Sequence, residues 1–185
     1  MSSKALKRIA KEIKNVQENP PQDIYIYPDQ KNIRKVTFMI VGSENTPYFG
    51  GYYFFKLTFP EKYPFEAPDV KFKSGNGQSI LPNSWGEDIC YSLLNAYKTI
   101  YRHTDTENSW TSTMSLNTLL VGLQSFMNSN PRKVEEFNYK YAINGVLNKT
   151  HCKQYYDMFK DVIISNYEKN KPMLMKNKTY SKYLP

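Results

Sequence analysis

The chain has only two cysteines, Cys90 and Cys152, and they lie far apart with no further cysteine near either. A disulfide framework or a zinc ribbon needs several cysteines at short spacing, so neither kind of small stapled domain fits this sequence. We therefore expect at least one free thiol, and the residues give no sign of a metal site.

Long apolar runs are also missing. No stretch approaches the roughly 18 to 20 apolar residues that a helix needs to cross a bilayer. The first residues, Met1 to Lys4, are not followed by the apolar segment of a secretory signal. We therefore expect an intracellular protein, cytoplasmic or nuclear, without a membrane anchor.

Arginine is scarce, with four of the 25 basic residues, and no nucleic-acid-binding motif is evident. We therefore expect no specific nucleic-acid partner. The net charge of +8 is concentrated at the ends of the chain: residues 1–35 hold eight basic and four acidic residues, and residues 131–185 hold eleven and five. Residues 36–130 hold six basic and eight acidic residues. We therefore expect the basic ends of the chain to contact acidic partners.

The 185 residues, 40% hydrophobic and 23% charged, suit one globular domain. Residues 3–17 carry apolar side chains three and four positions apart with basic residues between them, which predicts an amphipathic helix that ends before Pro20 and Pro21. Four runs rich in β-branched and aromatic residues then predict an antiparallel meander: 24–27, 36–41, 52–59 and 70–72.

Residues 74–112 have the composition of irregular structure, and a loop of that length inside a compact domain is usually functional. Helical patterns follow at 115–127, 134–148 and 152–168. We predict one α+β domain over residues 1–169 and a basic C-terminal tail over residues 170–185.

Four segments together resemble ubiquitin-conjugating enzymes. They are the TPYFGGYYF turn at 46–54, the FPEKYPFEAP segment at 59–68, the PN at 82–83 followed by ICYSLL at 89–94, and Trp110 followed by LLVGLQSFM at 119–127. The resemblance covers about residues 3–131. It implies the UBC fold, with an N-terminal helix, a four-stranded antiparallel meander, an active-site loop and C-terminal helices.

The chemistry of Cys90 fits this resemblance. A lone cysteine without an adjacent histidine is a poor hydrolase nucleophile, because hydrolysis needs a base beside the thiol. Thioester exchange needs only a thiolate that attacks an existing thioester and later leaves. The resemblance implies an acyltransferase in which Cys90 accepts ubiquitin from the activating enzyme and passes it to a substrate lysine or a ligase cysteine.

The resemblance also assigns Asn83 to the catalytic site, either as an amide donor to the oxyanion or as a brace of the loop. The chain departs from the family at Leu81, where the HPN motif has histidine. Asn83 and Cys90 are seven positions apart, one fewer than is usual in the family. An insertion over residues 95–109 follows Cys90 and contains His103, which is either a base near the thioester or an exposed loop residue.

The partners that the resemblance implies are ubiquitin, the activating enzyme, a ligase and a protein substrate, and we expect the chain to be a monomer. No cofactor is expected on this chain, because the activating enzyme uses the ATP. Predicted contacts with the activating enzyme are basic residues of the first helix: Lys4, Lys7, Arg8 and Lys11. Predicted contacts with the ligase are Phe65, Trp110 and Ser112.

Two alternatives stay open. One is a weak or inactive variant that keeps the fold as a ubiquitin- or ligase-binding module, which Leu81 and the shortened spacing from Asn83 to Cys90 favour. The other is a conjugating enzyme for a ubiquitin-like modifier.

Overall fold

The computed structural model describes residues 1–46, 48–73, 81, 84–89, 91, 93–94, 110–127 and 153–176. Within them the order of elements is α1 (Ser3–Glu18), β1 (Ile24–Pro28), β2 (Lys35–Val41), β3 (Tyr52–Thr58), β4 (Asp69–Phe72), β5 (Ser84–Trp85), β6 (Asp88–Ile89), α3 (Leu116–Met127) and α5 (Lys153–Lys176). The predicted helix over residues 134–148 lies outside the described residues.

Helix α1 forms where the apolar spacing predicts it. Ser2 caps its first turn by accepting a hydrogen bond from the backbone N–H of Ala5 at 3.2 Å, and Asn19 ends it before the two prolines. Its apolar stripe is buried, with Ile9 and Val16 almost completely enclosed. The helix is therefore attached to the sheet along one face and leaves its lysines on the other.

The sheet has six antiparallel strands in the order β1-β2-β3-β4-β6-β5. The first four form the predicted meander, which confirms the α+β class. The prediction of irregular structure across residues 74–112 was wrong for residues 84–89, where β5 and β6 form a short hairpin that joins the sheet through the pairing of Lys71 with Asp88. Strands of two residues carry too little alternation to be found from sequence.

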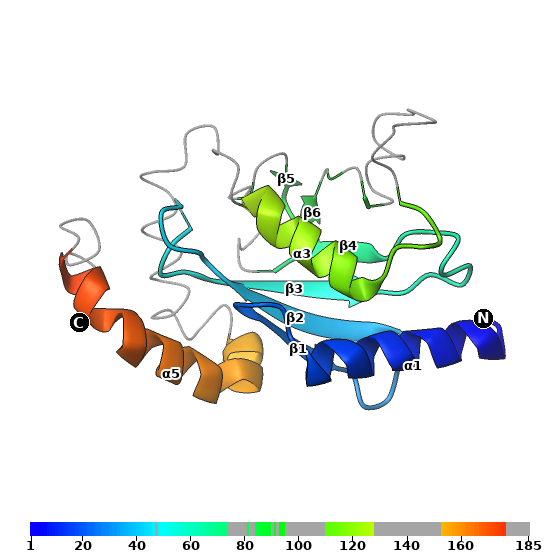
Figure 1. The fold of residues 1–185 in the computed structure, drawn as a ribbon, viewed down its shortest axis with the longest axis horizontal. Coiled ribbons are helices and arrows are strands. Elements are labelled where there is room, and N and C mark those ends of the chain that lie inside the picture. Colours follow the sequence, from blue (N-terminus) through cyan, green and yellow to red (C-terminus); the bar gives the residue numbers. More distant parts are fainter. Residues whose placement is uncertain are drawn as a thin grey trace.

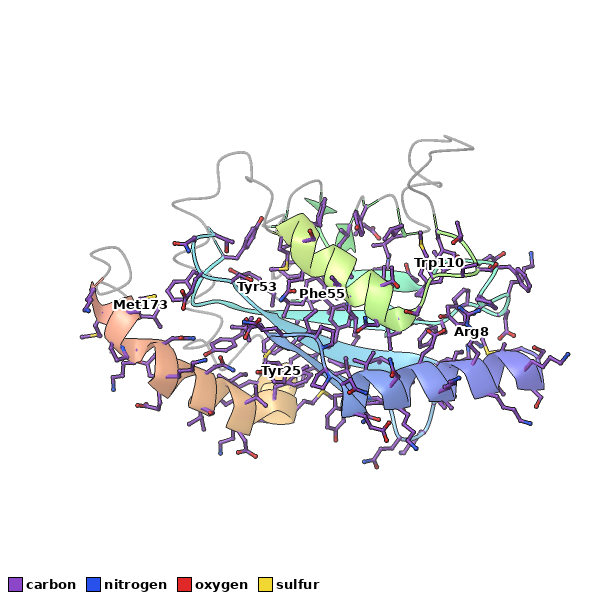
Figure 2. The ribbon with its side chains drawn as sticks, viewed as in Figure 1. Arg8, Tyr25, Tyr53, Phe55, Trp110 and Met173 are labelled. Atoms are coloured by element: carbon purple, nitrogen blue, oxygen red, sulfur yellow. The ribbon has the colours of Figure 1, made fainter. Side chains whose placement is uncertain are left out.

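The inner face of the sheet packs against α1 and α3. Phe38 lies opposite Phe55 and Phe55 opposite Phe72 in the strand register, and their ring centroids are 4.8 Å and 5.3 Å apart. Figure 2 labels Phe55 and Tyr53 in this layer between the sheet and α3. The rings of Phe38, Phe55 and Phe72 form a continuous aromatic row under α3.

The outer face carries a second apolar cluster. Met39, Val41, Tyr52 and Phe54 alternate with the inner-face residues of β2 and β3, and they pack against Tyr155, Phe159 and Ile163 of α5. Figure 1 shows α5 and α3 on opposite sides of the β2–β3 pair. The sheet is therefore covered on both faces in this region.

Helix α5 includes residues 153–168 of the predicted helix 152–168 and continues to Lys176, across the boundary predicted at residues 169 and 170. Its backbone leaves helical geometry at Phe159, where φ is −119° and ψ is 16°. None of the described helices has the length and apolar character that a membrane crossing requires.

The outer cluster generates a stability prediction. Phe159→Ala should lower the free energy of unfolding by about 3 to 5 kcal/mol in urea titration, because it removes a ring that stacks on Phe54 at 6.0 Å and leaves a cavity. Met158→Ala is the matched control, since Met158 is exposed on the same helix and should change stability by less than about 0.5 kcal/mol. Equal effects of the two variants would contradict the packing of α5 on the sheet.

Candidate functional site

Three residues predicted for the chemistry, Cys90, Asn83 and His103, lie outside the described residues. Their roles stay predictions. The structure does describe the residues on either side of Cys90 and the two surfaces predicted for partner proteins.

The residues that flank position 90 are anchored in the inner core. Ile89 is fully buried at the end of β6, and Leu93 and Leu94 are buried in the same cluster. The ring of Tyr91 lies 5.1 Å from that of Phe126 on α3. The chain is therefore anchored in the inner core immediately before the predicted nucleophile and held against α3 immediately after it.

Leu81 is also buried in the inner core, at 4% exposure. It occupies the position where the HPN motif has histidine. An apolar side chain packed in the core anchors the loop through burial, where a histidine would use hydrogen bonds. Leu81 therefore contributes to the scaffold through its burial in the inner core.

The acidic residues before Cys90 are paired with a lysine of the neighbouring strand β4 and with the lysine just after that strand. Asp88 forms an ion pair with Lys71, and Glu87 forms one with Lys73. The hydrogen bond from Lys71 to Asp88 is the main cause that raises the pKa of Lys71, so this lysine is charged at neutral pH. The negative charge nearest to Cys90 in the sequence is thus compensated, which reduces its repulsion of a thiolate.

Phe65 and Trp110 come from loops that are far apart in the sequence and adjacent in the structure. The indole N–H of Trp110 donates to the carbonyl oxygen of Pro64 at 2.7 Å, across 46 positions. Phe65 is 80% exposed, whereas Trp110 is buried and Ser112 is half-buried. Trp110 therefore fixes the two loops to each other, and Phe65 presents the apolar surface.

A half-buried carboxylate, that of Glu12, joins both loops to α1. It accepts hydrogen bonds from Arg8 Nε at 2.7 Å, from the Tyr63 hydroxyl at 2.5 Å and from the backbone N–H of Leu116 at 2.8 Å. The Arg8 guanidinium also donates to the carbonyl oxygen of Met114 at 2.7 Å. We call Arg8, Glu12 and their three partners the Glu12 network.

The Glu12 network has a clear electrostatic basis. Leu116 begins α3, and a carboxylate near the first N–H groups of a helix satisfies a donor that has no partner within the helix. Burial, together with the hydrogen bond to Glu12, raises the pKa of Tyr63, so its hydroxyl remains a donor. The sequence shows the i,i+4 spacing of Arg8 and Glu12, but it does not reveal the partners at positions 63 and 116.

The predicted surface for the activating enzyme divides into two parts. Lys4, Lys7 and Lys11 are exposed on α1, whereas Arg8 is half-buried and committed to the Glu12 network. The exposed lysines can attract an acidic partner, and Arg8 connects their helix to the loops of Phe65 and Trp110.

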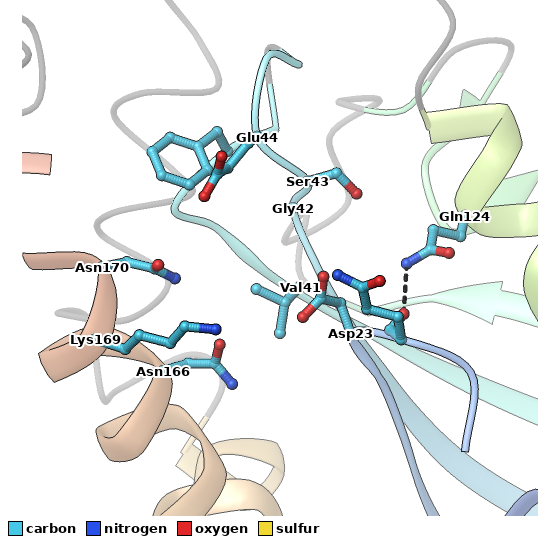
Figure 3. Close-up of a pocket in the computed structure, with 11 residues that line it drawn as sticks. Asp23, Val41, Gly42, Ser43, Glu44, Gln124, Asn166, Lys169 and Asn170 are labelled. Atoms are coloured by element: carbon cyan, nitrogen blue, oxygen red, sulfur yellow. Dashed lines mark hydrogen bonds between the residues drawn. The ribbon is translucent and has the colours of Figure 1, made fainter. Parts of the chain in front are cut away.

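The structure also has a polar pocket of about 440 Å³ between the C-terminal half of α5 and the end of β2. Figure 3 shows Asp23, Glu44 and Lys169 around it, with the hydrogen bond from Gln124 Nε2 to the carbonyl oxygen of Gln22 at 2.8 Å. None of the predicted site residues that the structure describes lines this pocket.

Comparison with known proteins identifies relatives across most of the chain. The family model described as "Ubiquitin-conjugating enzyme" matches residues 8–161. The chain is 29% identical over 133 residues to ubiquitin-conjugating enzyme E2 Z of Xenopus tropicalis, covering 70% of this chain and 40% of that protein. It is 36% identical over 126 residues to ubiquitin-conjugating enzyme E2 6 of Candida glabrata, covering 68% and 46%. The chain thus spans less than half the length of these two relatives.

Two solved structures are also similar. The ubiquitin-conjugating enzyme E2 of Plasmodium falciparum superposes with a TM-score of 0.55 at 30% identity, covering 69% of this chain and 86% of that one. The enzyme of Plasmodium vivax gives a TM-score of 0.52 at 29% identity, covering 65% and 98%.

The Glu12 network generates a second stability prediction. Glu12→Gln keeps the size of the side chain but removes the charge that Arg8, Tyr63 and the start of α3 share, so the free energy of unfolding should fall by about 1 to 3 kcal/mol in urea titration. Glu18→Gln on the same helix is the control, because its ion pair with Lys14 is exposed at 3.6 Å and should contribute less than about 1 kcal/mol. A loss at Glu12 no larger than that at Glu18 would show that the network does not stabilise the fold.

Proposed function

Because the chain belongs to the ubiquitin-conjugating enzyme family, we propose that it carries ubiquitin as a thioester on Cys90 and transfers it to an amine or to a second thiol. The observation that supports this most is that the family match covers Cys90 and that both of its neighbours in the chain are anchored, Ile89 in the inner core and Tyr91 against it. Such packing gives a loop nucleophile a defined position.

The proposed reaction has two acyl transfers. The Cys90 thiolate attacks the thioester carbonyl of ubiquitin bound to the activating enzyme, and the thiolate of that enzyme leaves. In the second step a substrate lysine amine or a ligase thiolate attacks the new thioester, the Cys90 thiolate leaves, and an attacking amine loses a proton. Asn83 is proposed to donate its amide N–H to the oxyanion or to brace the loop.

The proposed partner surfaces are separate from Cys90 in the sequence. The activating enzyme is proposed to bind the exposed lysines of α1, where opposite charge speeds association. A ligase is proposed to bind Phe65, which at 80% exposure is the most exposed large apolar side chain in the described part of the chain. ATP is proposed to be used by the activating enzyme, with no cofactor on this chain.

A charging reaction tests the proposed function. The chain, activating enzyme, ATP and ubiquitin should give a product larger by one ubiquitin on a non-reducing gel, and reducing agent should remove it. Cys90→Ala should abolish this product, whereas Cys152→Ala, the matched cysteine control, should retain it. Absence of a reducible product with ubiquitin and with ubiquitin-like modifiers would contradict the enzymatic proposal and favour the binding-module alternative.

The ligase surface gives a further prediction. Phe65→Ala should leave charging unchanged and slow ligase-dependent discharge at least tenfold, because loss of a central aromatic contact typically costs about 2 kcal/mol or more in binding. The rate is measured with a purified ligase that accelerates discharge of the wild-type chain. Ile33→Ala, which truncates an exposed side chain in another loop, is the control. Equal discharge rates for both variants would place the ligase surface elsewhere.

A further inference from the structure

Gly122 lies in the interior of α3, where glycine destabilises a helix by about 0.5 to 1 kcal/mol relative to alanine. A glycine at such a position usually has a packing reason. A Cβ atom at Gly122 would lie 2.7 Å from the hydroxyl oxygen of Tyr91 and 3.4 Å from Cδ1 of Leu93. The Tyr91 hydroxyl therefore occupies the space that a side chain at position 122 would need.

Tyr91 is also held through its ring. Phe126 is four residues after Gly122, so both lie on the same face of α3. The rings of Phe126 and Tyr91 have centroids 5.1 Å apart and planes inclined by 36°. We call the space bounded by Gly122 and Phe126 the Tyr91 notch. Half-burial in it raises the pKa of the Tyr91 phenol, so the hydroxyl is neutral.

The notch acts on the backbone next to the predicted nucleophile. Tyr91 and Cys90 are joined by one rigid peptide group, so a shift of the Tyr91 backbone also moves the backbone of Cys90. The N–H of Tyr91 donates to the carbonyl oxygen of Ile89 at 3.1 Å, a bond that spans position 90. Ile89 itself is fully buried. In the segment from Ile89 to Tyr91, burial therefore fixes the Ile89 end, whereas the Tyr91 end can shift.

We propose that the Tyr91 notch positions Cys90 for thioester exchange, with Tyr91 and Gly122 as positioning residues. This inference rests on the proposed function. It explains why α3 keeps a glycine that its own stability disfavours: the missing side chain lets the Tyr91 hydroxyl lie against the helix.

The direct test adds one methyl group to the notch. Gly122→Ala should slow thioester formation about tenfold, because a displacement of the order of 1 Å can cost up to about a hundredfold in rate. Its thermal unfolding should stay cooperative, because the preference of alanine for the helix offsets part of the cost of the contact with Tyr91. Val121→Ala, next to it and on the exposed side of α3, should charge at the wild-type rate.

The conservative partner variant should rescue the defect. Tyr91→Phe removes the oxygen that the new methyl group meets and leaves Leu93 Cδ1 at 3.4 Å and Tyr91 Cε1 at 3.6 Å as the nearest atoms. Gly122→Ala combined with Tyr91→Phe should therefore charge within about twofold of Tyr91→Phe alone, a strongly non-additive result. A purely structural defect of the helix would not be reversed in this way.

Two outcomes would overturn the inference. One is a folded Gly122→Ala chain that charges at the wild-type rate, and the other is a slowed chain that Tyr91→Phe does not rescue. If Gly122→Ala does not fold, Tyr91→Leu, which empties the notch, takes its place: it should charge about tenfold more slowly than Tyr91→Phe. Equal rates for these two variants would overturn the inference as well.

A second readout separates this inference from the proposed function. The rate and pH profile of Cys90 alkylation by iodoacetamide, measured in a Cys152→Ser chain, report the setting of the thiol without ubiquitin. A wild-type chain that forms no thioester would overturn the proposed function alone. The alkylation rate of Cys90 would then test the notch. A rate that changes in Gly122→Ala and is restored by Tyr91→Phe would support the inference, and equal rates in all variants would overturn it.

Discussion

The carboxylate of Glu12 connects three parts of the chain that lie far apart in the sequence. It accepts hydrogen bonds from Arg8 of α1, from Tyr63 in the segment before Phe65 and from the backbone N–H of Leu116 in the first turn of α3. The exposed lysines of α1, the apolar surface at Phe65 and the helix that carries Gly122 therefore depend on one charge-assisted cluster. Loss of that charge would loosen all three together, since a buried donor without a partner is costly.

The two-sided sheet supplies the rigid base for this arrangement. Alternate residues of β2 and β3 enter opposite cores, one under α1 and α3 and the other under α5. A strand with apolar residues on both faces cannot slip by one position without exposing one set or mismatching the other. Because β4 pairs with β3, the register of β3 also determines where β4 lies. Strand β4 in turn pairs with β6, which holds the segment before Cys90.

The sequence was sufficient to predict the elements whose apolar residues recur with a regular period. The stripe of α1 and the four meander strands have clear periods, and exposed Phe65 lies in a segment specific to the family. It was insufficient for interactions between distant segments, such as the hydrogen bonds of Glu12 with Tyr63 and Leu116 or the fit of Tyr91 against Gly122. The consecutive apolar residues at 52–55 indicate a strand buried on both faces, but they do not reveal that α5 covers the outer one. The roles of Cys90, Asn83 and His103 stay predictions.

The proposed function requires ubiquitin to be carried on one thiol, that of Cys90. Peptide mass spectrometry of the charged chain, after alkylation of all accessible thiols under denaturing conditions, tests this requirement. The peptide containing Cys90 should escape alkylation until the thioester is cleaved, while the peptide containing Cys152 should be alkylated both before and after the thioester is cleaved. Alkylation of Cys90 in the charged chain, or protection of Cys152 in its place, would rule out Cys90 as the carrier.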